Sequence, residues 1–219
     1  MEEKFERMQK QFSFLLELDK MKNLYRQTYI YCDDLPYGSK EFEDNFKERL
    51  PLPRKENDAE HSFSLALAVM ILAEYSDRKI DVTKTMKMVL VHDVVEIDAG
   101  DTYCYDAVGN LTKRERELKA AERIFGLLPE DQQSEYRSLW DEFEENITPE
   151  ACFANAMDRV QPMLLNYIRG GISWKEHNVH FPEVAERSMK IKDGSEELWR
   201  YFYSLLEESR NKGVLPEAN

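Results

Sequence analysis

The chain has little cysteine, and its cysteines form no recognisable pattern. The three thiols, Cys32, Cys104 and Cys152, are odd in number and have no CxxC spacing. Disulfide frameworks and cysteine-ligated zinc sites both need paired or closely spaced cysteines. We therefore expect free thiols and a cytoplasmic, reducing environment.

Long apolar runs and clusters of basic residues are also missing. No apolar run approaches the roughly 20 residues of a membrane span, and the highly charged first ten residues do not resemble a signal peptide. The 30 basic and 43 acidic residues give a formal net charge of −13. This charge disfavours binding to nucleic acid or to an anionic membrane. A small anionic substrate held by a few local cations remains compatible with it.

Alternation typical of strands is absent, whereas helical periodicity recurs. Apolar residues from Phe5 to Tyr25 recur at helical spacing and predict a helix over about 3–29. Capping patterns and Pro or Gly punctuation delimit the remaining predicted helices, which span 41–50, 57–76, 81–98, 112–126, 129–145, 148–169, 182–192 and 195–212. The sequence therefore predicts an all-α fold, with 1–219 as a single domain of about nine helices.

The segment 88–105 combines an apolar stretch with one histidine and four acids, which are His92, Asp93, Glu96, Asp98 and Asp101. Buried carboxylates are rare unless they are paired or bound to a metal. At about 100° per residue, Glu96 projects within roughly 40° of His92. Gly100 ends the helix and lets Asp101 turn back. The alternative, a helix end with solvated acids, fits the apolar flanks less well.

Two more polar residues face inward on other predicted helices. His61 continues an apolar stripe of its helix, and Asp158 lies on a face of small and apolar residues from which the adjacent Arg159 points away. Taken singly, a core histidine or a salt-bridged aspartate is the more common explanation. Jointly, His61, His92, Asp93 and Asp158 indicate one divalent cation held between helices. This donor set suits Mn, Fe, Co, Ni or Zn better than Ca, and Mg is also compatible.

The order His61, His92-Asp93, Asp158 resembles the H…HD…D signature of HD-domain metal-dependent phosphohydrolases. The segments RKENDAEHS at 54–62, HDVVEIDAGD at 92–101 and AMDRVQP at 156–162 are similar to the branch that includes bacterial 5′-deoxynucleotidases. The resemblance covers roughly 20–205. It implies a single HD-domain helical bundle with those four residues as metal ligands.

The resemblance also implies roles for residues around the metal. Glu96 and Asp101 match the acidic pair that surrounds the attacking water and the substrate, and Arg54 matches a basic residue that contacts phosphate. Lys55 is the second candidate for substrate binding, although a solvated surface lysine is an equally good interpretation. The nucleotidases follow their arginine with Gly-Trp or Trp, whereas Lys55-Glu56 follows here. This departure concerns nucleotide selectivity more than phosphoester hydrolysis.

These features predict a metal-dependent phosphohydrolase of a small phosphomonoester, with a nucleoside 5′-monophosphate as the first expectation. Two alternatives stay open: a hydrolase of a cyclic nucleotide or a nucleoside triphosphate, and a non-catalytic binding module stabilised by its metal. A triphosphate would need more cations near the motif, and a structural metal would not need Glu96 and Asp101.

Three other features have plainer interpretations. The polar cluster from Trp174 to His180 favours a surface loop over a lid, and the basic residues 113–116 favour a solvated helix face. The aromatic residues 199–202 indicate helix packing or the surface of a homodimer.

Overall fold

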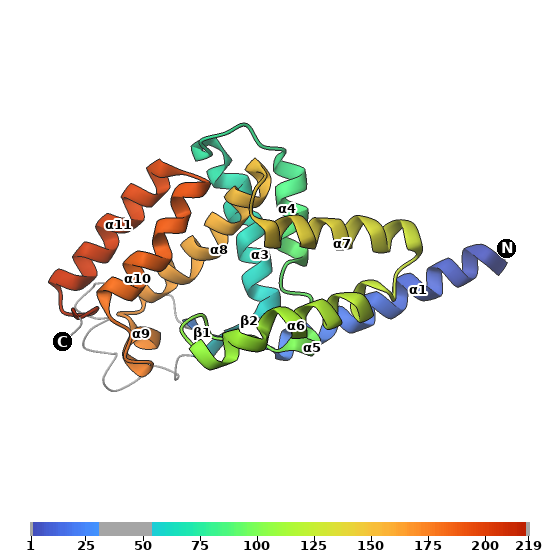
Figure 1. The fold of residues 1–219 in the computed structure, drawn as a ribbon, viewed down its shortest axis with the longest axis horizontal. Helices are drawn as coiled ribbons and strands as arrows, with labels where there is room; N and C mark the ends of the chain where they lie inside the picture. Colours follow the sequence, from blue (N-terminus) through green and yellow to red (C-terminus); the bar gives the residue numbers. More distant parts are fainter. Residues whose placement is uncertain (1, 31–53, 218–219) are drawn as a thin grey trace.

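The computed structural model describes residues 2–30 and 54–217, and they are predominantly helical (Figure 1). The predicted all-α class is confirmed. The predicted helix over 41–50 lies outside the described residues.

The first predicted helix, over 3–29, is wrong in its second half. Helix α1 spans Glu2–Leu18, a 3-10 helix follows over Asp19–Asn23, and strand β1 spans Tyr25–Ile30. This strand pairs antiparallel with β2, Arg54–Asn57, so the expectation of no strand is also wrong. Aromatic and β-branched residues dominate β1, and such side chains favour a pleated, half-buried strand.

Most of the apolar stripe on α1 does not reach the core. Phe14 is buried against Phe125 and Tyr136, whereas Phe5, Phe12 and Leu16 stay exposed. In Figure 1 the N-terminal end of α1 extends beyond the rest of the molecule. Helical periodicity therefore identified the helix correctly but not what its apolar face packs against.

Three helices, α3 (Asp58–Leu72), α4 (Val82–Val91) and α8 (Pro149–Ile168), pack against one another at the centre of the fold. Each begins at a predicted N-cap. Asn57 forms a capping box with Glu60, and the side chains of Asp81 and Thr148 accept backbone hydrogen bonds at the starts of α4 and α8. These caps satisfy N–H groups that would otherwise be unpaired and set where each helix starts.

The predicted helix over 81–98 is divided in the structure. α4 ends at Val91, tight turns follow, and α5 spans only Glu96–Ala99 before Gly100. The backbone N–H of Glu96 donates to the backbone carbonyl oxygen of Asp93, three residues earlier, at 2.9 Å. Gly100 has φ of 75°, a conformation that disfavours a side chain, and reverses the chain as predicted.

Helices α6 (Ala107–Phe125) and α7 (Glu130–Glu145) come next in the chain. α6 starts earlier than the predicted 112, because the Asp106 carboxylate accepts hydrogen bonds from two backbone N–H groups of the first turn. The cap at Asp106 satisfies N–H groups that would otherwise be unpaired, so the helix begins there and not at the predicted position 112.

The C-terminal part contains α9 (Ile172–Glu176), α10 (Phe181–Ser188) and α11 (Glu196–Asn211). The expected surface loop at 174–180 is partly wrong, because Trp174 lies on α9 and is buried in a second apolar cluster with residues of α10 and α11. No helix among the described residues is long and apolar enough to cross a membrane.

Asn57→Ala should destabilise the protein by about 1 kcal/mol, because it removes the cap of α3. For a chain of this size that corresponds to a melting temperature lower by roughly 2–4 °C. Thermal unfolding in the presence of a chelator measures the effect on the fold alone. Asn57→Ser, which keeps an acceptor, should melt close to wild type, and equal losses in both variants would contradict the capping role.

Candidate metal centre

The two histidines are held so that one ring nitrogen of each faces the same point. The Nδ1 of His92 donates to the carbonyl oxygen of Val89 at 2.9 Å. The Nδ1 of His61 lies 3.0 Å from the Oε1 of Gln161, whose Nε2 in turn donates to Glu56. Both imidazoles are buried. Fixing Nδ1 in this way leaves Nε2 of each ring available as a ligand atom.

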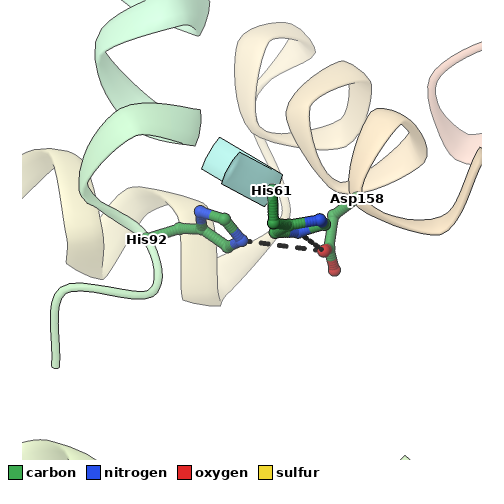
Figure 2. Close-up of side chains that lie close together, drawn as sticks. All are labelled: His61, His92 and Asp158. Atoms are coloured by element: carbon green, nitrogen blue, oxygen red, sulfur yellow. Dashed lines mark hydrogen bonds and ion pairs between the residues drawn. The ribbon is translucent and has the colours of Figure 1, made fainter. Parts of the chain in front are cut away.

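Both Nε2 atoms face a shared carboxylate. The Oδ1 of Asp158 lies 3.0 Å from Nε2 of His61 and 3.6 Å from Nε2 of His92 (Figure 2). Asp93 joins them, with its Oδ2 at 3.0 Å from Nε2 of His92 and 3.7 Å from that of His61. The four residues predicted to bind a metal therefore converge from α3, the turn after α4, and α8.

These residues fit a divalent cation. With Nδ1 donating, each Nε2 faces carboxylate oxygens, which are acceptors, so either a proton on Nε2 or a bound cation must lie between them. The Nε2 of His92 is buried and has no hydrogen-bond partner among the described residues. His61, His92 and Asp158 offer ligand atoms within 4.8 Å of one another. The cluster can hold a metal ion through nitrogen and oxygen donors.

Negative charge is in excess around the centre. A second group of acids, Asp58, Asp93 and Glu96, also brings its ligand atoms within 4.8 Å of one another. Burial and then Asp93 raise the pKa of Asp58 to about 8. Burial and the neighbouring carboxylates raise the pKa of Glu96 well above its usual range. Protons partly offset this excess, and a cation offsets it in the same way.

The side chain of Arg26 lies among these acids and contributes a positive charge. Arg26, on β1, donates to Asp93 at 2.6 Å and to Asp58 at 3.3 Å, and one of its nitrogens lies 3.8 Å from Asp158. Although burial raises the pKa of Asp93, the positive charges of His92 and Arg26 outweigh it and hold that pKa below the usual range.

The cluster of His61, His92, Asp93 and Asp158 opens into a cavity between α8, α10 and the loop after Gly100. Arg26, Glu96 and Asp101 line this cavity together with the predicted ligands Asp93 and Asp158. Lys113 lines it as well and pairs with Glu117, so the expected solvated face at 113–116 is not fully solvated. The predicted acidic pair thus shares one cavity with the predicted metal ligands.

Hydrogen bonds from a residue on α6 hold the loop that carries Asp101. The guanidinium of Arg116 on α6 donates to the carbonyl oxygen of Ala99 and, at 2.8 Å, to the hydroxyl of Thr102. Asp101 lies between these two anchored residues. Burial raises the pKa of Asp101, against the lowering effect of Arg26.

Arg54 and Lys55 do not reach the cavity. Both lie on β2, and the side chain of Arg54 is 44% exposed and paired with Glu60. The ammonium of Lys55 donates to Gln27 and lies above the ring of Tyr29. Neither residue lines the space beside the metal cluster.

Sequence reasoning missed Arg26, whose side chain is only 15% exposed, and the support that Gln161 gives to His61. A strand assignment for the aromatic and β-branched residues around Arg26 would have placed it beside the start of α3. Gln161 follows Asp158 by three residues, a spacing that puts two side chains on one helix face.

Comparison with known proteins agrees with this geometry. The HD domain family matches residues 46–199. Proteins named 5′-deoxynucleotidase HDDC2 are 31% identical over 111 residues in Homo sapiens and 30% identical over 111 residues in Xenopus laevis. These matches cover 51% of this chain, and 53% and 54% of the respective relatives. The chain thus spans about half the length of the curated relatives it matches.

Solved structures extend the similarity over most of the chain. A crystal structure from Magnetospirillum magnetotacticum, described as a predicted metal-dependent phosphohydrolase, is 41% identical and has a TM-score of 0.81, covering 95% of both chains. The PH0347 protein from Pyrococcus horikoshii is 23% identical with a TM-score of 0.58, covering 91% of this chain and 98% of that one. The latter likeness concerns the fold alone.

Asp158→Ala should abolish stabilisation by added metal. For the wild type, a divalent ion at 100 times its dissociation constant should stabilise the fold by about 2.7 kcal/mol. Thermal unfolding with and without Mn²⁺, together with elemental analysis, measures both stabilisation and occupancy. His180→Ala, outside the cluster, should retain the metal. Full occupancy in Asp158→Ala would remove Asp158 from the ligand set.

Metal affinity should rise with pH. Burial lowers the pKa of His92, but the charges of Asp93 and Asp158 outweigh it and raise this pKa well above its usual value. A proton therefore occupies His92 in the metal-free protein near neutral pH and must leave when the cation binds. With one linked proton, affinity should change by about tenfold per pH unit. Calorimetry in buffers of different ionisation enthalpy measures the proton release, and pH-independent binding would contradict it.

Proposed function

This chain belongs to the HD domain family, and from that premise we propose that it is a metal-dependent phosphohydrolase. The proposed substrate is a small phosphomonoester, a nucleoside 5′-monophosphate. The observation that carries the proposal is the shared cavity, in which a cation site, a buried arginine and an acidic side chain outside the ligand set all meet. A cation used only for stability would need neither Arg26 nor Asp101 beside it.

Each component corresponds to one requirement of phosphoester hydrolysis. His61, His92, Asp93 and Asp158 would hold the cation, which polarises a phosphoryl oxygen and makes water more acidic when bound. Arg26 would donate hydrogen bonds to the phosphoryl oxygens and offset their developing negative charge. Because Arg26 pairs with Asp93, its guanidinium is already oriented beside the ligands before substrate arrives.

Asp101 and Glu96 would act on the attacking water and the substrate. Asp101 follows a glycine turn and lines the cavity, so its carboxylate is placed to orient a water and accept its proton. Glu96 is held on α5, buried among acids, and its Oε2 has no hydrogen-bond partner among the described residues. A substrate hydroxyl or a water could satisfy that oxygen. In this proposal the four metal ligands neither accept the proton of the water nor contact the substrate hydroxyl.

The rest of the cavity supports a nucleoside more than a simple phosphate ester. Tyr103, Tyr105 and Trp174 line it together with Met163, and aromatic faces are the common partners of flat bases. Burial raises the pKa of Tyr103 to about 12, so its phenol stays neutral at physiological pH. The name 5′-deoxynucleotidase carried by the HDDC2 relatives supports the same substrate class.

The direct test is release of inorganic phosphate from a panel of ribo- and deoxyribonucleoside 5′-monophosphates, with Mn²⁺, Co²⁺, Zn²⁺ and Mg²⁺ supplied separately. We expect turnover with at least one metal and a preference among the nucleotides. Cyclic nucleotides and nucleoside triphosphates are the comparison substrates. If only cyclic nucleotides or nucleoside triphosphates are hydrolysed, the proposed substrate class is wrong. If no substrate is hydrolysed with any metal, the non-catalytic binding module is favoured.

Arg26→Gln should lower kcat/KM for the phosphorylated substrate by about 10²-fold or more, the usual scale for a preorganised donor to developing charge. Arg54→Gln is the matched control, because Arg54 pairs with Glu60 outside the cavity, and its kinetics should stay near wild type. Steady-state kinetics on both variants, with metal content measured alongside, makes the comparison. If Arg54→Gln lowers kcat/KM and Arg26→Gln does not, Arg54 is the residue that contacts the phosphate.

Asp101→Asn should retain its metal and lose kcat by about 10²-fold, the scale of a positioned acid–base group. Glu96→Gln should also retain the metal, with a mixed loss in kcat and KM. Asp98→Asn, on the same short helix but paired with Arg123 away from the cavity, is the control. Metal loss in Asp101→Asn would make Asp101 a ligand and overturn this division of roles.

A further inference from the structure

Two arginines line the cavity without any role in the proposed hydrolysis. Arg159 follows the ligand Asp158 on α8, and Arg187 lies on α10. The helical spacing predicts that Arg159 points away from the Asp158 face, yet both residues line the same cavity. Their guanidinium groups therefore add positive charge to a space that already contains Arg26.

Arg159 is held in place but not satisfied. One of its terminal nitrogens donates to the backbone oxygen of Asn155 at 2.7 Å and lies 3.1 Å from the Asn155 side-chain oxygen. Asn155 is itself buried and anchored by hydrogen bonds to Phe143 and Ala151. The Nε of Arg159 is buried and has no hydrogen-bond partner among the described residues. Leaving a buried donor unsatisfied is unfavourable, and more so when the donor is charged.

Within residues 2–30 and 54–217, no side chain forms a hydrogen bond or ion pair with Arg187. Its charge acts across the cavity on the 103–105 loop. Burial raises the pKa values of Cys104 and Tyr105, and the positive charge of Arg187 opposes both shifts. Arg187 and the 103–105 loop, which continues from Asp101, line the same cavity.

The two guanidinium groups line one cavity, where the charges of Asp158 and Arg187 act on Arg159 in opposite directions. No carboxylate of the described residues lies within 4.0 Å of either guanidinium. This is unusual for a chain with a formal net charge of −13. Two neighbouring cations without a carboxylate partner in a cavity form a site for an anion.

We propose that Arg159 and Arg187 form a second anion subsite, which binds a phosphate or carboxylate group of the substrate other than the phosphoryl group being cleaved. The inference rests on the proposed phosphohydrolase function and adds to it a preference for substrates that carry a second anionic group. Arg26 serves the phosphoryl group at the metal cluster, and the arginine pair receives the second group. A guanidinium group can bind either a phosphate or a carboxylate, because its paired N–H groups donate to two oxygens at once.

The test compares three substrates with the metal-loaded protein: a nucleoside 5′-monophosphate, the same nucleoside 3′,5′-bisphosphate, and a small phosphorylated hydroxy acid. The measured quantity is the ratio of kcat/KM for each two-anion substrate to that for the monophosphate. Wild type should favour at least one two-anion substrate by about tenfold or more. A preference for the bisphosphate assigns the subsite to phosphate, and one for the hydroxy acid assigns it to carboxylate.

The variants are Arg159→Gln and Arg187→Gln, with Arg200→Gln on exposed α11 as the matched control. Each cavity variant should lower the ratio to near one, mainly through KM, because the subsite contributes binding rather than chemistry. Arg159→Lys keeps the charge without the Nε donor and should restore part of the preference. If Arg159→Gln fails to fold, Arg187→Gln tests the subsite alone, since Arg187 is exposed.

Binding separates this inference from the proposed function. Calorimetric affinity for the bisphosphate relative to the monophosphate is measured on wild type and both glutamine variants, whether or not phosphate is released. Absence of turnover with a ratio that still falls in the variants would overturn the hydrolase and keep the subsite. A wild-type ratio near one, or a ratio unchanged by both variants, would overturn the subsite even if monophosphates are hydrolysed.

Discussion

The concentration of buried negative charge at the meeting point of three helices is the constraint on which the rest of the site depends. Asp58, Asp93, Glu96 and Asp158 lie close together with Arg26 as their arginine partner. Two carboxylates about 4 Å apart repel by roughly 4 kcal/mol at an effective dielectric of about 20. A typical hydrogen bond contributes only about 0.5–1.5 kcal/mol. Neighbouring hydrogen bonds are therefore too weak to hold this cluster, whereas a divalent cation can.

The fold supplies what such a cation needs. Val89 and Gln161 fix the two imidazoles through Nδ1, and α8 brings Asp158 to both Nε2 atoms. Because each support comes from a different segment, binding the cation and holding the helices together are one event. Stability and metal occupancy should therefore change together when a ligand is removed.

The cavity beside the candidate metal centre has an acidic side and a basic side. Its metal side carries the acids with Arg26, and the side toward α10 carries Arg187, with Arg159 on α8. Aromatic side chains of the 103–105 loop and α9 lie among the lining residues. The HD domain family accounts for the first side. The second side is where we propose that a second anionic group of the substrate binds.

The sequence by itself determined the all-α class, most helix starts and the four residues that meet at the candidate metal centre, because capping residues and inward-facing polar residues are local signals. Only the tertiary structure decided that Arg26 enters the cavity and Arg54 does not. That choice depends on β1 pairing with β2, which sets Tyr29 opposite Lys55 and brings Arg26 beside Asp93. Likewise, the break after Val91 follows from turns that direct Asp93 and Glu96 into one cavity. Contacts between residues distant in sequence leave no periodic pattern to read.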